Sequence, residues 1–415
     1  MAAPPTRSAE ELRARREARR RRVRRRRLGA LALLLALGGG GGGTAALWPG
    51  GSSPAAVAES GPAPAPPPAT TKAPAATVAE TLPPAPPLLP PPEPPPPLPP
   101  IAIAAVGDIA AGDSPSLPRG GARALFARVR PLLGADVVLG NLETALTETG
   151  VQQCGPRSRG CFSFRAPSSY ARGLADAGFT VLNLANNHAF DFGRAGLLDT
   201  IAALKDAGVR QTGRPGQIAY VRVGKTRVAV VGFAPNDWAQ DLLDLDAARS
   251  LVRRAAKRAD VVIVTMHAGA EGSRYAHVRP GMETFLAEPR GDPVRFAHAV
   301  VRAGADLVVG HGPHVLRGIE WYRGRLIAYS LGNFASYRNF DVTGAGGVSA
   351  ILYVTLHADG TWVDGRLVPI RLAGTGAPAR DADGAALGVV RSLSREDFGR
   401  RAVRVSLDGD LRPPL

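Results

Sequence analysis

From residue 101 onward, the chain alternates apolar runs of five or six residues with stretches whose apolar positions have helical spacing. The helical stretches are 121–132, 168–177, 194–207, 246–258 and 293–303. Each of them leads into an apolar run that is typical of a buried strand. Repeated strand and helix units predict a largely parallel sheet that is covered on both faces.

A second group of β segments is joined by short glycine turns. These segments are 218–223, 227–233, 326–329, 348–356 and 362–372, and a short helix is expected at 385–394. They indicate that the sheet has antiparallel parts or a second layer. The sequence therefore predicts an α/β fold over residues 101–415, arranged as a layered α/β sandwich.

Polar side chains follow five of the predicted strands directly. The stretch 182–193, LNLANNHAFDFG, stops being apolar at Asn186, Asn187 and His188. The other four strand ends carry Asp108; Asn141 and Glu143; His267 and Glu271; and His311 and His314. Because α/β sheets bind ligands at the carboxyl ends of their strands, we expect these side chains to converge at one sheet edge. For Asn141 and Glu271 taken singly, a hydrogen-bonded strand end is the alternative.

Aspartate, glutamate, asparagine and histidine side chains form a mixed oxygen and imidazole set. Such a set suits Zn, Mn, Fe or Mg rather than a thiolate site. A metal bound by such groups lowers the pKa of a coordinated water, which is how hydrolytic metal sites work. We therefore predict a divalent metal ion as the cofactor.

The two cysteines, Cys154 and Cys161, enclose a small polar loop. In an exported domain such a pair predicts a disulfide. A metal site would need two further soft ligands, which the sequence does not offer.

The first hundred residues have a different composition. Residues 1–27 contain 12 Arg and 3 Glu, so they hold +9 of the formal net charge of +16, and the rest of the chain has an unremarkable +7. No basic motif interleaved with aromatic residues follows, so we expect no nucleic-acid partner. The charge is instead typical of the cytoplasmic flank of a membrane segment.

Residues 28–48 follow this basic tail and begin with a Leu/Ala run. At roughly 1.5 Å per residue they would extend about 31 Å, close to a bilayer core of about 30 Å. They predict a single-pass signal-anchor, and a cleavable signal peptide is the alternative. Residues 49–100 are rich in proline and alanine and predict a disordered linker. Both alternatives place residues 49 onward outside the cytoplasm, and the signal-anchor, which we favour, would also hold the domain at the cell membrane.

Several motifs, taken in order, resemble the CapA family of poly-γ-glutamate capsule synthesis proteins. They are Gly107-Asp108, Asn141-Leu-Glu143, Leu184-Ala-Asn-Asn-His188 with Asp191 and Gly193, His267-Ala-Gly with Glu271, Gly310-His-Gly-Pro-His-Val315 and Tyr329-Ser-Leu-Gly-Asn-Phe334. The resemblance covers residues 101–372 and implies a fold similar to calcineurin-like metallophosphoesterases.

The resemblance also implies roles for individual residues. His188 looks like the catalytic histidine, acting as an acid or stabilising the transition state. The implied metal ligands are Asp108, Asn187, His267, His311 and His314, and the strand-end carboxylate of Glu143 is predicted as a further ligand. Residues expected to support them or to contact substrate are Asn141, Asn186, Asp191, Glu271 and Asn333.

This chain departs from the phosphoesterase pattern at three positions. Ala110 replaces the histidine of an Asp-x-His motif, Asn141 replaces a bridging aspartate, and Pro313 lengthens the last motif by one residue. One metal position is therefore more secure than two, and Glu143 is a candidate for the missing carboxylate.

Two functions follow as expectations. The first is a membrane-anchored part in the biosynthesis or export of a capsule, with poly-γ-glutamate or another anionic polymer as ligand and a polymer synthase complex as partner. The second is a metal-dependent hydrolase of phosphoesters or of envelope amide or ester bonds. The resemblance favours the first function, and the predicted ligands favour the second.

Overall fold

The computed structural model describes residues 98–154 and 161–415. Its largest sheet has eight strands in the order β18-β17-β16-β1-β2-β5-β6, with β15 also paired to β1. These strands are β1 (Ile101–Ala110), β2 (Val137–Leu142), β5 (Val181–Asn183), β6 (Arg210–Thr212), β15 (Asn333–Ser336), β16 (Val348–Leu356), β17 (Trp362–Ala373) and β18 (Ala377–Arg380). The neighbours β1, β2, β5 and β6 run parallel, whereas β16, β17 and β18 pair antiparallel.

The second sheet has six strands in the order β13-β14-β12-β9-β8-β7. They are β7 (Ala219–Val223), β8 (Thr226–Phe233), β9 (Val261–His267), β12 (Leu307–His311), β13 (Ile319–Tyr322) and β14 (Arg325–Ala328). Its central strands β8, β9, β12 and β14 are parallel, and antiparallel strands β7 and β13 close its edges.

The two sheets pack face to face around a shared core. Strand β1 shows how, because Ile101, Ile103 and Ala105 contact the second sheet, whereas Ala104 and Val106 join a separate cluster with helices. Successive side chains of a strand point to opposite faces of the sheet. Because β1 has apolar side chains on both faces, both faces of this sheet must be covered.

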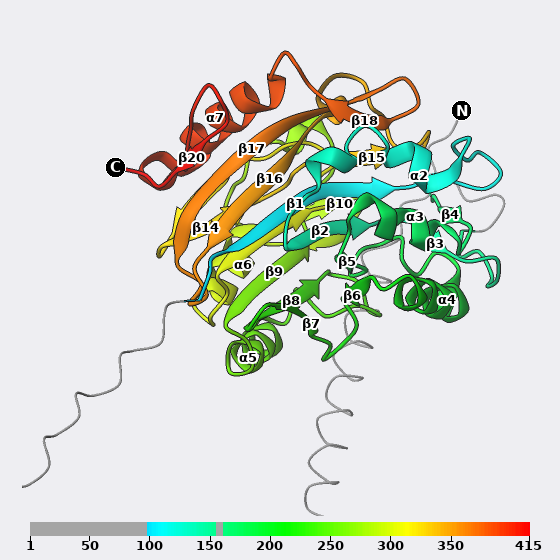
Figure 1. Cartoon of the computed structure of the whole chain (residues 1–415), viewed down its shortest axis with the longest axis horizontal. Coiled ribbons are helices and arrows are strands. Elements are labelled where there is room, and N and C mark those ends of the chain that lie inside the picture. The colour runs from blue at the N-terminus through cyan, green and yellow to red at the C-terminus, as the bar shows by residue number, and fades with distance from the viewer. Residues whose placement is uncertain (1–97, 155–160) are drawn as a thin grey trace, which may run out of the picture. The chain divides into compact units, whose positions relative to one another are not determined.

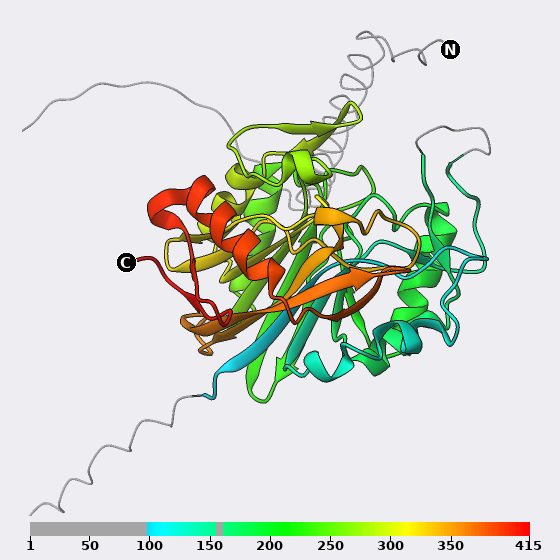
Figure 2. The same ribbon diagram turned by 90° about the horizontal axis from the view of Figure 1, so that it is seen from above.

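Helices cover the two outer faces. Helices α2 (Gly121–Phe126), α3 (Tyr170–Ala177) and α4 (Gly193–Asp206) pack on the eight-stranded sheet. Helices α5 (Leu245–Ala256) and α6 (Pro293–Val301) pack on the six-stranded sheet. Helix α7 (Ala385–Phe398) lies against β13 and β17 and adds side chains to the core between the sheets (Figures 1 and 2). The domain is therefore a four-layer α-β-β-α sandwich.

Smaller elements complete the described chain. They are the pair β3 (Ala145–Leu146) and β4 (Arg165–Ala166), the hairpin β10 (Glu283–Phe285) and β11 (Glu288–Gly291), the pair β19 (Arg404–Val405) and β20 (Leu411–Arg412), and 3-10 turns at Arg130–Leu132, Ser273–Tyr275, Gly344–Gly347 and Gly399–Arg401.

The predicted α/β class is confirmed, with two differences in detail. The largely parallel sheet expected from the repeated strand and helix units is divided between two sheets, and the glycine-turn segments supply antiparallel strands to both, in agreement with the antiparallel parts or second layer that they indicated. The helix predicted over 121–132 ends at Phe126 and is followed by a 3-10 turn that contains Pro131. Proline has no backbone N–H and clashes with the preceding turn, so it interrupts an α-helix there.

The N-terminal predictions concern residues that the structure does not describe. The basic tail 1–27, the membrane segment 28–48 and all but the last three residues of the linker 49–100 lie outside the described ranges. Within 98–154 and 161–415, no helix has the length and apolarity needed to cross a bilayer.

Candidate metal centre

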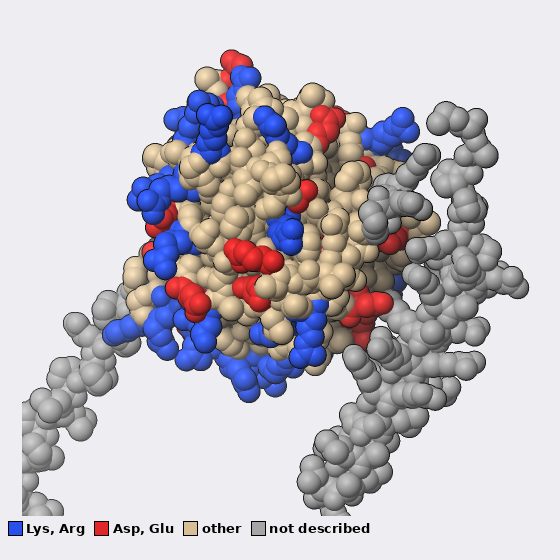
Figure 3. All heavy atoms as spheres, turned by 90° about the vertical axis from the view of Figure 1, so that its right-hand side faces the viewer, with Lys and Arg blue, Asp and Glu red and all other residues tan. Residues whose placement is uncertain are grey.

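Strand register brings most of the predicted residues to one place. In the large sheet, Asp108 is directly opposite Asn141, and Asn141 is opposite Asn183 on the next strand. In the second sheet, His311 is opposite His267. All these strands are parallel to their partners, so their carboxyl ends lie at the same edge of each sheet. The face of the domain toward which the arrow of β1 points is shown in Figure 3.

The loop after β12 approaches this edge closely because of Gly312. Its φ is +103°, and a Cβ there would lie 3.0 Å from the His267 ring and 3.2 Å from Arg290 Nη2. The amide of Gly312 donates a hydrogen bond of 3.1 Å to Asp108 Oδ2. Glycine at this position therefore links the two sheets, and any larger residue would push the loop away from Asp108.

Asp108, Glu143 and His267 form the centre of the site. One potential ligand atom from each lies within 4.8 Å of the other two, and all three side chains are fully buried. Glu143 Oε1 lies 2.9 Å from His267 Nδ1, yet neither oxygen of Glu143 makes a hydrogen bond within the described part of the chain. Both ring nitrogens of His311 are also buried without a hydrogen bond to any described residue. Buried polar atoms normally have partners, so these orphaned atoms fit a divalent metal ion.

Asp108 organises the side chains around it. Its Oδ1 accepts a hydrogen bond of 2.8 Å from Asn141 Nδ2 and lies 3.5 Å from His311 Nδ1. Its Oδ2 lies 3.2 Å from His314 Nδ1. Burial disfavours the charged carboxylate, but the contacts with His311 and His314 outweigh it and hold the pKa of Asp108 well below its usual value.

Burial and neighbouring charges shift two further groups. Burial and the negative charge of Asp108 raise the pKa of Glu143 to about 7. Burial works against a charged His314, but the carboxylates of Glu143 and Asp108 raise its pKa to about 9. Burial and the charge of Arg290 hold the pKa of His267 well below its usual value, so this ring is neutral.

Asparagine side chains hold the ligand loops in place. Asn183 and Asn186 each donate to Asn141 Oδ1, at 2.9 and 3.1 Å, and Asn186 Oδ1 accepts from the backbone amide of His188 at 3.0 Å. Asn333 Oδ1 lies 3.0 Å from His314 Nδ1. The sequence did not single out Asn183, because it lies inside an apolar run. The signal that could have indicated Asn183 is that it is a polar residue within an otherwise apolar run.

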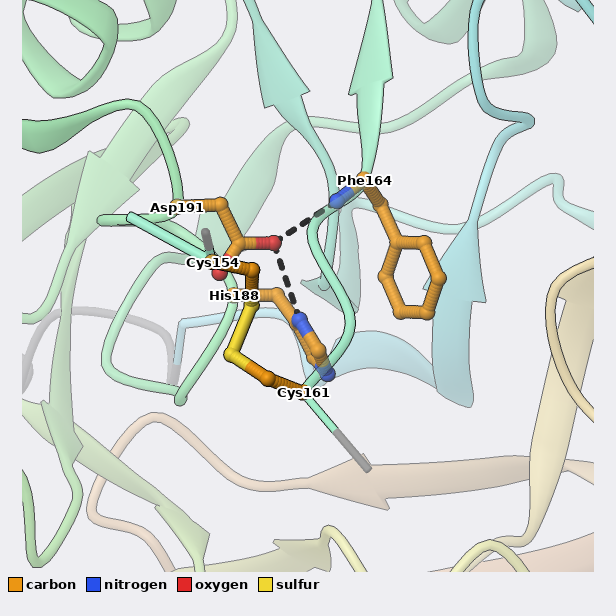
Figure 4. Close-up of a disulfide and its surroundings, with 5 residues drawn as sticks. All are labelled: Cys154, Cys161, Phe164, His188 and Asp191. Carbon is orange, nitrogen blue, oxygen red and sulfur yellow. Dashed lines mark hydrogen bonds and ion pairs between the residues drawn. A yellow bond between two sulfur atoms is a disulfide. The ribbon is translucent and has the colours of Figure 1, made fainter. Parts of the chain in front are cut away.

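His188 forms a pair with Asp191 beside the buried cluster. His188 Nδ1 lies 2.9 Å from Asp191 Oδ2, and the other ring nitrogen points away from Asp191 (Figure 4). The charge of His188 is close enough to lower the pKa of Glu143. The Phe340 ring lies 4.2 Å from the His314 ring and 6.4 Å from the His188 ring, so it connects the two histidines.

Asn187 is the predicted ligand in the loop that follows β5. It follows β5 at the edge where the cluster lies, but its Oδ1 is buried and makes no hydrogen bond to a described residue. This oxygen is therefore a further orphaned acceptor near the site rather than part of the hydrogen-bonded frame.

Arg290 is a site residue that the sequence analysis missed. It lies on β11, and its Nη2 is 3.1 Å from His267 Nε2, while its Nη1 is 2.9 Å from Glu271 Oε1. The Nε–H donates to the carbonyl oxygen of Gly269 at 3.0 Å. Glu271 is thus tied mainly to Arg290, with its other oxygen 3.9 Å from His314 Nε2. No motif surrounds Arg290, and the β10–β11 hairpin that carries it was not predicted.

Comparison with known proteins gives matches to the same region. Residues 102–338 match the family model described as bacterial capsule synthesis protein PGA_cap. A PGA biosynthesis protein CapA from Bacillus subtilis is 33% identical over 233 residues, which are 52% of this chain and 57% of that protein. A capsule biosynthesis protein CapA from Bacillus anthracis is 32% identical over 257 residues, 56% of this chain and 59% of that protein. This chain thus matches less than two thirds of the length of these relatives.

Among solved structures, a 5′-nucleotidase precursor from Thermus thermophilus overlaps with a TM-score of 0.38 and 16% identity, covering 72% of this chain and 59% of that one. The family match covers more than half of the chain and contains the motifs at Asp108, Glu143, His188, His267 and His311. The chain therefore belongs to the bacterial capsule synthesis protein family, PGA_cap, as its motifs predicted.

Proposed function

We propose that this protein takes part in the biosynthesis or export of an anionic envelope polymer, with poly-γ-glutamate as the leading candidate, and that it does so through a divalent metal. The observation that carries the proposal is the fully buried set of Asp108, Glu143 and His267, whose potential ligand atoms lie within 4.8 Å of one another and in which neither Glu143 oxygen has a hydrogen bond to a described residue. A polymer synthase complex is the proposed partner, in keeping with the names of the curated relatives.

The surface around the site is compatible with an anionic ligand. Figure 3 shows acidic side chains near the middle of this face and Lys and Arg side chains gathered along its lower and left-hand rim. Basic side chains at the rim would attract a polyanion, and the positive charge of a bound divalent ion would offset the acidic side chains at the centre. An anionic chain is therefore a better match than a neutral one.

The residues present can hold one metal more readily than two. Asp108, Glu143, His267, His311 and His314 supply two carboxylates and three imidazoles. Asn141 is neutral, and its side chain already hydrogen-bonds Asp108, Asn183 and Asn186. Ala110 has no ligand atom. A second metal would thus lack the charged ligands of a two-metal phosphoesterase.

The second candidate function is hydrolysis, and the His188–Asp191 pair favours it. A divalent ion in the cluster would act as a Lewis acid on an ester or amide oxygen. Asp191 holds His188 through Nδ1, which fixes the ring and leaves Nε2 to give a proton to a leaving group. Burial of Phe164 and the partial burial of Phe340 keep water away from part of this ring. These features suit slow hydrolysis of an envelope polymer rather than fast phosphatase chemistry.

One set of variants tests both functions. Wild type, His188→Ala and His311→Ala are compared for metal content, hydrolysis of model phosphoesters and γ-glutamyl amides, and polymer at the cell surface. We expect His311→Ala to lose metal and surface polymer, because it removes a buried ligand. We expect His188→Ala to keep its metal.

The outcomes separate the two functions. Loss of surface polymer in the variants, without hydrolysis by wild type, supports the synthesis or export role. Hydrolysis by wild type that disappears in His188→Ala supports the enzyme. Variants equal to wild type in all three assays would exclude both functions.

We also propose a location, which rests on residues 1–100. The arginine cluster precedes the predicted membrane segment 28–48, so the amino terminus should face the cytoplasm and the domain should lie outside. Protease added to intact cells is expected to degrade the domain. Protection of the domain until the cells are lysed would contradict this topology.

A further inference from the structure

A disulfide lies next to the His188–Asp191 pair. Cys154 and Cys161 are bonded, as the sequence analysis expected, with their Cα atoms 5.7 Å apart. Cys154 is buried, whereas Cys161 is exposed at the surface. Figure 4 shows the bond together with the two side chains of the pair, and Gln153, the residue before Cys154, hydrogen-bonds the Asp191 backbone. Neither sulfur has a role in the proposed chemistry, so the position of the disulfide next to the His188–Asp191 pair needs a separate explanation.

The two chain segments that the disulfide joins both hold Asp191. On one side, the backbone amide of Gln153 donates a hydrogen bond of 2.7 Å to the Asp191 carbonyl oxygen. On the other side, the backbone amide of Phe164 donates a hydrogen bond of 2.8 Å to Asp191 Oδ2. That same carboxylate oxygen lies 2.9 Å from His188 Nδ1. Asp191 is thus held at its backbone and at its carboxylate by residues on opposite sides of the crosslink.

Phe164 also fixes the histidine ring by packing. Its ring centroid lies 4.4 Å from that of His188 and 5.5 Å from that of Phe340. Its carbonyl oxygen accepts a hydrogen bond of 3.1 Å from Ala145, two residues after Glu143. The segment at Phe164 is therefore anchored to the metal cluster, whereas no strand pairing is found at Gln153 within the described ranges. The crosslink is the covalent tie that sets the distance between the two segments.

We infer that the Cys154–Cys161 disulfide is a positioning element for His188: it fixes Asp191 between Gln153 and Phe164, and Asp191 in turn fixes the imidazole. The inference rests on the proposed hydrolytic role of His188. The cysteines touch no reacting atom, and their effect reaches the histidine only through Asp191. In its oxidised form the protein has an aligned histidine, and after reduction the Gln153 segment can separate from the Phe164 segment.

The test compares the double variant Cys154→Ser/Cys161→Ser, and wild type treated with a mild reductant, with untreated wild type. NMR of the imidazole reports the hydrogen bond at His188 Nδ1, and hydrogen exchange reports the amide of Phe164. In the double variant and in the reduced protein, we expect the His188 Nδ1 hydrogen bond to weaken and the Phe164 amide to exchange faster. Hydrolysis of the model substrates is expected to fall about 10-fold, because a small misplacement of an acid or base costs one to two orders of magnitude. Metal content should not change.

Two comparisons make the test specific. Asp191→Asn should reproduce the imidazole signature without affecting the disulfide, and Val151→Ala, an exposed change in the same loop, should leave every reading as in wild type. In an Asp191→Asn background, removal of the disulfide should not change the His188 imidazole signal further, since the two changes act on one unit.

The readings also separate this inference from the proposed function. Altered His188 and Phe164 signals without hydrolysis by wild type would support the positioning role while removing the hydrolase. Unchanged signals and unchanged hydrolysis in the folded double variant would overturn the inference. A further change of the His188 imidazole signal when the disulfide is removed in the Asp191→Asn background would overturn it as well.

Discussion

Raising the pH from 7 to 9 is expected to tighten binding of a divalent ion such as Mn²⁺ by about 100-fold, since each ligand proton that the metal displaces changes the affinity tenfold per pH unit. In the metal-free protein, the carboxylates of Glu143 and Asp108 raise the pKa of His314 to about 9, so His314 is protonated at neutral pH. Burial raises the pKa of Glu143 to about 7, and this group is ionised over most of the range.

Metal affinity rises with pH because the metal ion competes with a proton for the His314 ring. A raised pKa means that His314 keeps its proton up to about pH 9, and a metal must remove that proton to use the ring as a ligand. Affinity therefore rises with pH until His314 is neutral and then becomes constant. Titration calorimetry in two buffers of different ionisation enthalpy measures both the affinity and the proton released.

His314→Gln is the control for this experiment. It removes the titrating ring and should bind more weakly at pH 9, with a much smaller change in affinity between pH 7 and 9. An affinity in wild type that is independent of pH over this range would show that His314 is not a ligand.

Glu283→Ala is expected to destabilise the domain by about 3 to 5 kcal/mol, because it leaves a buried charge without its partner. Arg317 is fully buried, and its two terminal nitrogens donate to Glu283 at 3.0 and 2.8 Å. Arg317 also donates to the carbonyl oxygen of Ala270, whose amide donates to Glu283 Oε2. Loss of Glu283 therefore affects both the arginine and the loop that carries Glu271.

Chemical denaturation measures this free energy of unfolding. Glu288→Ala is the matched control, since Glu288 is an exposed carboxylate on the same hairpin, and a surface change of this kind alters stability by less than about 0.5 kcal/mol. Similar midpoints for the two variants would show that Arg317 finds other partners when Glu283 is absent.

Much of the α/β architecture could be predicted from local sequence. Helical spacing indicated helices such as α5 and α6 close to their observed bounds, and the apolar runs that follow them are strands β9 and β12. Hydrophobic periodicity depends only on residues close together in the sequence, so it can be recognised without knowledge of tertiary contacts. A second layer was expected, but the assignment of each strand to one of the two sheets could not be predicted, because it depends on which strands pair over long sequence distances.

Some residues of the candidate site could likewise be predicted from the sequence, and others could not. Polar residues at the ends of apolar runs indicated Asp108, His267 and His311 as residues to bring together, because strand ends in α/β sheets share an edge. Sequence alone did not indicate Asn183 or Arg290. Asn183 was hidden in an apolar run, and Arg290 reaches His267 only through a hairpin with no sequence signal of its own.

From the sequence alone follow the family, the α/β class, the polar strand ends and the cysteine pair, because each depends on residue type and short spacing. The tertiary structure alone decided which of these groups touch. The amide of Gly312 reaches Asp108 across 204 positions of the chain, and the segments flanking the disulfide meet at Asp191. Such contacts depend on sheet order and loop path, which are set by the packing of the whole domain.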